Sequence, residues 1–427
     1  MKRTASRTPG YVRGVARCGA EIFSAQELQS VSHRTSDLSM RDRWVGSSQE
    51  LVLCICAALV PVCRENGEGP SSTLIVVTGH SSGRIMLRRV GSSVGEDAAD
   101  GEPEPLTLPL EGAVRALALA SGMLAAGTES GVVQLVRIAL LDGCSPDAIR
   151  ADVLARVDLG GECEAIALSA SALRLSAGCS GAADGCSGLH VWDVSLPLTP
   201  LLDDALDGPD ASDDDDELTG RTGAQYLVDC FGDAALQPEL QADVYAIAMR
   251  ADGAQLVAGS SQGDVWLWAW PARTGAPPEL MWSTRRAGAV QAVGLTASGL
   301  VVAASDHKPD DQSAAGTAVL LLRSDDGPAR EVELPNSRSI YCKDAVCEGG
   351  VQRPWLTGGG MWCGEWKPVP LAADTVCPVC SSAFPVVLAT CLVDEPDGTT
   401  TLIFGGYGRQ IERWSAVFGG GAEDRDR

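Results

Sequence analysis

Short apolar runs separated by glycine-containing turns recur along most of the chain. Each copy has an apolar run, a turn of about four residues, and a second run in which apolar and polar residues alternate. Alternation of this kind is typical of a strand with one buried face, and two such runs around a short turn predict an antiparallel hairpin. We expect seven hairpins, which begin at Thr73, Met123, Leu173, Gln255, Leu300, Trp355 and Thr401.

In four of these copies the turn carries two glycines in nearly the same places. The pairs are Gly79 with Gly83, Gly127 with Gly131, Gly259 with Gly263, and Gly406 with Gly408. Because glycine tolerates positive φ, we expect each pair to let the chain reverse and start an antiparallel partner strand.

Further short runs flank the hairpins and predict a third and a fourth strand for each unit. Alternating runs precede most hairpins, at residues 113–120, 162–169, 243–250 and 289–296. Other runs follow them, at residues 151–159, 278–283 and 330–334. Successive copies lie roughly 50 residues apart, as in β-propeller blades, apart from one longer step. We therefore predict an all-β chain: a seven-bladed β-propeller with four antiparallel strands per blade over residues 49–418.

Three segments fall outside this repeat. Residues 203–217 place nine acids in 15 positions, a composition that predicts a solvated insertion loop in the long step. Residues 1–48 are a basic segment, and residues 419–427 are a polar tail. Because the last unit ends near Ala416 without an outer strand, we expect residues 20–31, or those around Trp44, to supply that strand and close the ring.

The repeat resembles the WD-repeat family. Residues 190–194, HVWDV, match its closing strand, with Trp192 and Asp193 in the signature positions, and DVWLWAW and IERWSAV are similar, more degenerate versions. The Gly-His pair of that family is missing, and only Asp184 supplies the expected acid in a hairpin turn, so apolar packing must replace the family's buried polar network. The last two units, around WLTGGGMWCGEWKPV and GGYGRQIERWSAVFG, are similar to the WD-repeat subunit of the THO messenger-export complex.

Charge and cysteine usage narrow the class of protein. With 33 basic and 56 acidic residues the net charge is −23, which repels phosphate backbones, so we expect no direct binding of nucleic acid. The 15 cysteines are scattered, several within apolar runs, as in proteins of a reducing compartment; we expect the nucleus, the cytoplasm or both. The longest apolar run, residues 51–63, is too short to span a membrane as a helix. Five basic residues up to Arg17 form a basic tail, a nuclear-targeting stretch or a transit peptide.

Candidate chemistry is sparse. GHSSG at residues 79–83 fits a nucleophile-elbow pattern around Ser81, but a strand-like run follows it and GSSQG repeats it in another copy, so a turn is favoured. The four histidines lie in separate segments, at His33, His80, His190 and His307. Cys377 and Cys380, with Cys342, Cys347 and Cys363 upstream, leave a zinc site open, although their spacing is loose. Trp266, Trp268 and Trp270 alternate and should pack between blades. We predict no catalytic, cofactor-binding or metal-binding residue and no cofactor.

The repeat without a catalytic constellation favours a non-catalytic scaffold for protein partners in a multi-subunit complex. Within that class the THO resemblance implies an RNA-processing or messenger-export subunit. A substrate adaptor of a cullin ubiquitin ligase is the alternative, weakened because its docking box wants Arg where Ser195 stands, and a propeller-type hydrolase is the third reading. The acidic loop is a candidate surface for a basic partner, through Asp213, Asp214, Asp215, Asp216 and Glu217.

Overall fold

A computed structural model describes most of the repeat region in separate stretches. These are residues 2–8, 12–26, 30–45, 50–63, 71–90, 106–141, 149–170, 174–181, 188–194, 227–229, 242–270, 278–286, 288–306, 318–323, 330–333, 346–347, 351–352, 355–357, 361–363, 387–406 and 410–416. Within them every regular element is a strand, and no helix is long and apolar enough to cross a membrane.

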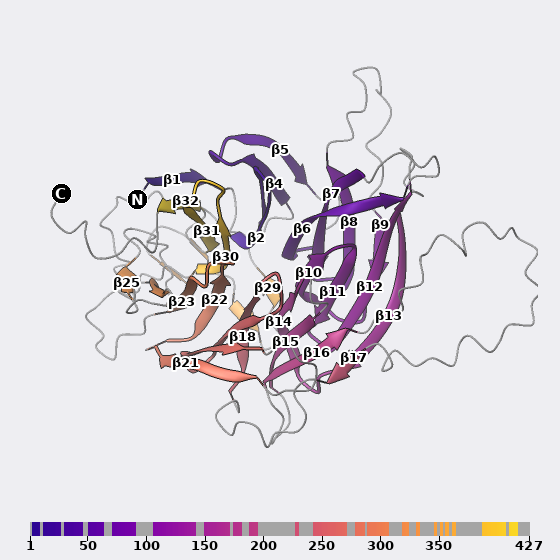
Figure 1. Cartoon of the computed structure of the whole chain (residues 1–427). Coiled ribbons are helices and arrows are strands. Elements are labelled where there is room, and N and C mark those ends of the chain that lie inside the picture. The colour runs from indigo at the N-terminus through magenta and orange to yellow at the C-terminus, as the bar shows by residue number, and fades with distance from the viewer. Residues whose placement is uncertain are drawn as a thin grey trace, which may run out of the picture.

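Five antiparallel sheets of four strands each are present in these residues (Figure 1). The first contains β2 (Val12–Cys18), β3 (Glu21–Gln26), β4 (Ser30–Thr35) and β5 (Met40–Val45). The second contains β14 (Glu162–Leu168), β15 (Arg174–Ser180), β16 (Leu189–Val194) and β17 (Leu227–Asp229), and the third β18 (Val244–Met249), β19 (Gln255–Ser260), β20 (Asp264–Ala269) and β21 (Glu279–Arg285). The fourth contains β22 (Val290–Leu295), β23 (Val301–Asp306), β24 (Ala318–Arg323) and β25 (Arg330–Glu333). The fifth contains β30 (Val387–Asp394), β31 (Thr400–Gly406), β32 (Gln410–Ala416) and β1 (Lys2–Arg7).

An eight-stranded sheet joins two further runs of four strands. One run is β6 (Val52–Cys63), β7 (Ser71–His80), β8 (Arg84–Val90) and β9 (Leu106–Pro109). The other is β10 (Val114–Ala120), β11 (Met123–Thr128), β12 (Val132–Leu141) and β13 (Ile149–Asp158). The runs meet where the long strands β6 and β12 pair in parallel, Val62 with Leu140 and Cys63 with Leu141. Two small hairpins complete the described strands: β26 (Val346–Cys347) with β27 (Val351–Gln352), and β28 (Trp355–Thr357) with β29 (Met361–Cys363).

The first strands of these four-stranded runs contact one another in a circular order. We call β2, β6, β10, β14, β18, β22 and β30 the inner strands. Each contacts the next in this order, and β30 also contacts β2. The sheets therefore stack face to face around a common centre, which buries the alternating apolar positions of each strand between neighbours.

Apolar side chains fill the spaces between successive sheets. Trp266, Trp268 and Trp270 all lie buried in one cluster with Leu189 and Val191 from the preceding sheet, which confirms their expected role in packing. The rings of Trp266 and Trp268 stack with their centroids 6.0 Å apart. Cys163 and Cys179 are likewise buried among apolar residues, as small hydrophobic side chains.

The outer strand of the last sheet comes from the beginning of the chain, at β1. Its six residues pair antiparallel with β32, from Lys2 opposite Ser415 to Arg7 opposite Gln410, and Figure 1 shows the two strands side by side. Residues 20–31 and Trp44, expected to fill this place, belong instead to β3, β4 and β5. Their own hairpin holds them, because β3 pairs with β4 from Glu21 to Gln26.

Residues 12–45 are therefore not an appendage to the repeat but one of its four-stranded sheets. The copy expected at Trp355 is described only in part: β28 and β29 pair with each other and with no other described strand. The hairpins expected from residues 73, 123, 255 and 401 are present, as are the flanking strands that the alternating runs predict.

An ion pair links the first sheet to the last beside this junction. The Arg17 guanidinium makes two hydrogen bonds to the Glu395 carboxylate, at 2.6 and 3.0 Å, and the two side chains are only 7% and 16% exposed. These hydrogen bonds lower the pKa of Glu395 below its ordinary value, with a smaller contribution from the charge of Arg413.

Candidate interaction face

One end of the sheets presents the turns that precede the inner strands together with the turns between second and third strands. Hydrogen bonds join neighbouring turns: Glu129 N donates to Ala113 O at 2.8 Å, and Leu159 N donates to Gly131 O at 2.9 Å. Because Val114 pairs with Thr128, the start of the inner strand lies beside this turn. We call this end the turn face.

Every inner strand carries a register shift at its second residue. In each strand the first and third residues are paired with the neighbouring strand and the second is skipped. A bulge of this kind leaves one residue outside the ladder and redirects its side chain. We call the skipped positions the bulge residues: Arg13, Leu53, Arg115, Glu164, Tyr245, Gln291 and Leu388.

The bulge residues were not singled out in the sequence, although a signal for them exists. Each follows a buried Val or Cys and precedes a small residue, as in Val114-Arg115-Ala116 and Val244-Tyr245-Ala246. The small residue pairs with the second strand, at a glycine in four of the seven sheets that include Gly127 and Gly259. The recurring order of buried, variable and small residues marks the position.

The bulge residues near the middle of the chain lie among acidic side chains. Arg115 Nη2 lies 3.3 Å from Glu129 and 4.0 Å from Glu162. Burial raises the pKa of Glu164, opposed by a hydrogen bond of 2.8 Å that the Ser180 hydroxyl donates to its carboxylate. Burial, and after it the nearby carboxylates, also raise the pKa of Tyr245. This part of the turn face therefore carries negative potential around one arginine.

The hairpin glycines divide into two roles rather than sharing one. Gly83, Gly131 and Gly263 have φ of 83°, 86° and 93°, as expected for a reversing turn. Each lies against the backbone before the next inner strand: a Cβ on Gly83 would lie 2.7 Å from the carbonyl oxygen of Gly112. These glycines therefore let the turns of adjacent sheets interlock.

The first glycine of each pair serves a different purpose from the one expected. Gly79, Gly127, Gly259 and Gly406 are not among the described glycines with positive φ. A Cβ on Gly79 would lie 2.5 Å from Val114 Cγ1, and one on Gly259 would lie 2.7 Å from Val290 Cβ. These two glycines make room for the first residue of the next inner strand, and close approach of the sheets, not reversal, requires them.

The WD dipeptide lies at the opposite end of its sheet from the turn face. Trp192 is buried and stacks on His190, with ring centroids 5.7 Å apart. The Asp193 carboxylate accepts a hydrogen bond of 2.8 Å from Arg174 Nε, while Arg174 Nη1 donates to Gly253 O of the next sheet at 2.7 Å. Asp193 thus orients an arginine that ties two sheets together.

Ser81 lies in a turn between two strands rather than before a helix. Its Oγ accepts a hydrogen bond of 3.0 Å from Leu51 N, and β8 follows it. The neighbouring His80 Nε2 is hydrogen-bonded to Thr78 Oγ1 at 2.9 Å, and burial lowers the pKa of this imidazole. Thr78 and Leu51 thus hold these two polar groups in structural contacts.

Several sequence candidates have side chains outside the described residues. They are His307, Gly408, the acidic loop from Asp213 to Glu217, and the cysteines Cys342, Cys347, Cys363, Cys377 and Cys380. Among the side chains that the structure describes, no group of three or more His, Cys, Asp or Glu could hold a metal ion.

The stacked antiparallel sheets with inner strands in a circular order define the chain as a β-propeller, and solved structures specify the type. A chain of the crystal structure of the mitotic checkpoint complex matches with a TM-score of 0.55 at 14% identity, over 97% of this chain and 91% of that chain. The WD40 β-propeller domain of Doa1 matches with a TM-score of 0.51 at 11% identity, over 97% and 96% of the two chains. No protein-family model and no curated protein matches the sequence. The chain has the fold of a WD40 β-propeller; at these identities the likeness shows the fold alone.

Proposed function

We propose that this chain is a non-catalytic WD-repeat scaffold that joins proteins in a multi-subunit complex. In this proposal the seven four-stranded runs are the blades of one ring, and β1 completes the last blade. The observation that carries it is the set of bulge residues: seven side chains of differing chemistry, one per inner strand, presented at the same end of a rigid fold. Such a face suits several protein contacts at once.

We further propose a place for the scaffold in an RNA-processing or messenger-export complex of the THO type, in the nucleus, the cytoplasm or both. The support is the resemblance of residues 405–419 to the WD-repeat subunit of that complex. A cullin-ligase adaptor remains the rival, with Ser195 where its docking box wants arginine. A hydrolase ranks below both, since Ser81 Oγ is engaged with Leu51 N.

Affinity purification of matched variants tests the proposal. Glu162, which is 47% exposed, and Tyr245 lie on the turn face, whereas Glu279 lies exposed on the outer strand β21. We expect the wild type and Glu279→Arg to recover the same export-complex subunits, also after ribonuclease treatment. The double variant Glu162→Arg/Tyr245→Ala should lose them at least about tenfold, because it reverses a charge and removes a ring at the contact.

Two results would change this conclusion. Recovery of ligase subunits without export factors reverses the order of the two scaffold functions. Identical partner lists from the double variant and Glu279→Arg would place the contacts away from the turn face, and the absence of any stoichiometric partner would count against a scaffold.

A further inference from the structure

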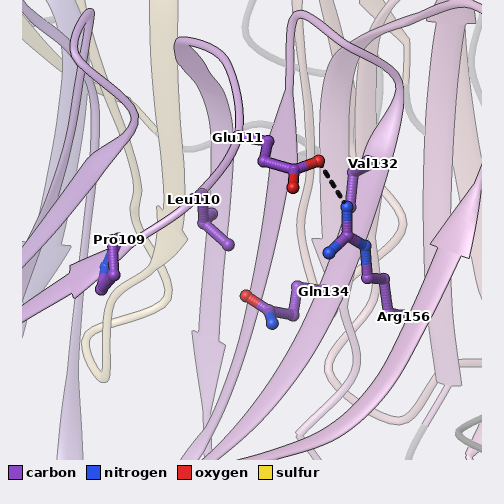
Figure 2. A pocket seen from close by; sticks show the side chains of 6 residues that line it. All are labelled: Pro109, Leu110, Glu111, Val132, Gln134 and Arg156. Carbon is purple, nitrogen blue, oxygen red and sulfur yellow. Dashed lines mark hydrogen bonds and ion pairs between the residues drawn. The ribbon is translucent and has the colours of Figure 1, made fainter.

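A small hollow opens at the turn face between the outer strand β9 and strands β12 and β13. It has a volume of about 240 Å³. Figure 2 shows the residues that line it: Pro109, Leu110, Glu111, Val132, Gln134 and Arg156. Because pockets for drug-sized ligands usually measure about 300 to 1,000 Å³, this one is of a size for a single side chain.

Three polar side chains meet at the hollow, and two of them have acceptors to spare. Glu111 Oε2 accepts a hydrogen bond of 2.7 Å from Arg156 Nη2. Within the described residues neither Glu111 Oε1 nor the Gln134 amide has a side-chain hydrogen bond. In Figure 2 the Gln134 amide reaches into the space between Leu110 and Arg156. The hollow thus offers a carboxylate oxygen and an amide oxygen to a hydrogen-bond donor.

The existing ion pair does not seal this hollow. The side chains of Glu111 and Arg156 are 77% and 52% exposed, so their pairing contributes at most about 1 kcal/mol. An incoming cation can therefore share the Glu111 carboxylate with Arg156 at little cost.

The surrounding turns favour a positively charged occupant. Ser130 Oγ donates to Glu111 O at 2.9 Å, which holds the turn of Glu129 against that of Glu111. Leu159 N donates to Gly131 O, which brings Asp158 to the same rim. With the chain at a net charge of −23, this rim attracts basic partners.

We propose that this hollow receives an arginine side chain of a protein partner, an inference that rests on the proposed scaffold function. The aliphatic stem of the arginine lies against Leu110 and Val132, and its guanidinium donates to Glu111 Oε1 and to the amide oxygen of Gln134. Arginine fits better than lysine because its planar fork supplies donors to two acceptors at once.

Methyl NMR of the full chain, with ¹³C-labelled Leu and Val methyl groups, tests this directly. The probe is N-acetyl-arginine methylamide, and the methyl signals of Leu110 and Val132 report on the hollow itself. We expect these signals to shift saturably, with half-saturation on the order of 1–10 mM. Glu111→Gln and Gln134→Leu should each weaken binding about tenfold, while Glu279→Gln, an equal charge change elsewhere, should leave it unchanged.

Other results overturn the inference. They are the absence of saturable shifts up to about 50 mM probe, equal shifts with the capped glutamate or norleucine analogue, or wild-type binding by Glu111→Gln with its remaining methyl spectrum intact. Tighter binding of the capped lysine would overturn the choice of arginine. If the hollow fails while partner recovery still depends on Glu162 and Tyr245, the scaffold function stands and this inference alone falls.

Discussion

Replacing Gly263 by alanine tests whether the turns of adjacent sheets interlock as tightly as the structure shows. Gly263 has φ of 93°, and a Cβ there would collide with the Arg286 carbonyl oxygen and lie 2.8 Å from that of Gly288. The left-handed conformation costs an alanine about 1–2 kcal/mol, and overpacking against rigid neighbours adds about 1–3 kcal/mol. We expect Gly263→Ala to lower the free energy of unfolding by about 2–5 kcal/mol.

Gly398 offers a matched control, because it shares the strain without the collision. Its φ is 79°, and a Cβ there would meet no atom within 4 Å. Gly398→Ala should therefore lose only the conformational part, about 1–2 kcal/mol. Urea unfolding followed by tryptophan fluorescence measures both, compared at equal slope. Equal losses from the two variants would refute the argument, since the interlock would then contribute nothing.

Three further predictions concern polar contacts and thiols. Arg17→Met should cost about 3 kcal/mol at pH 7, because it leaves Glu395 poorly solvated and unpaired. The lowered pKa of Glu395 means that the pair stabilises fully above the unfolded pKa of about 4.3 and is lost as pH falls through the folded value, so the cost should shrink in urea unfolding at pH 3. Arg174→Met should cost about 3 kcal/mol through the lost contacts with Asp193 and the next sheet, and a loss under about 1 kcal/mol in the same assay would contradict this role. Burial raises the pKa of Cys391 to about 11, so iodoacetamide at pH 8 should label it roughly a hundredfold more slowly in the folded chain than in urea, by mass spectrometry.

The hairpins and their flanking strands were predictable because alternation and glycine turns report directly on half-buried strands. The sheet at residues 12–45 was not, because its glycine has moved. In β2 and β3 the small pair is Gly14 opposite Ala25, with the glycine on the inner strand, where a Cβ would lie 2.8 Å from Ile55 Cγ2. The space requirement is the same, but the two-glycine signature is absent, so the segment resembled a basic tail.

The candidate face was harder to predict than the strands. Nothing in a hydrophobic pattern shows that the residue after Val114 or Val244 leaves the ladder, since a bulge depends on the register between two strands. The hollow at Glu111 depends in addition on contacts between residues more than 20 positions apart, such as Gln134 and Arg156, which only the stacking of two sheets brings together.

Hydrogen exchange of β1 tests the central claim, that a strand from the start of the chain completes the last sheet of a closed ring. The register pairs six residues, Lys2 to Arg7, with β32. Mass spectrometry of the full chain should therefore find amides in residues 2–7 protected from exchange to nearly the degree of residues 410–416. Complete exchange of residues 2–7 within seconds, with residues 387–406 still protected, would contradict the account and leave β32 as an open edge.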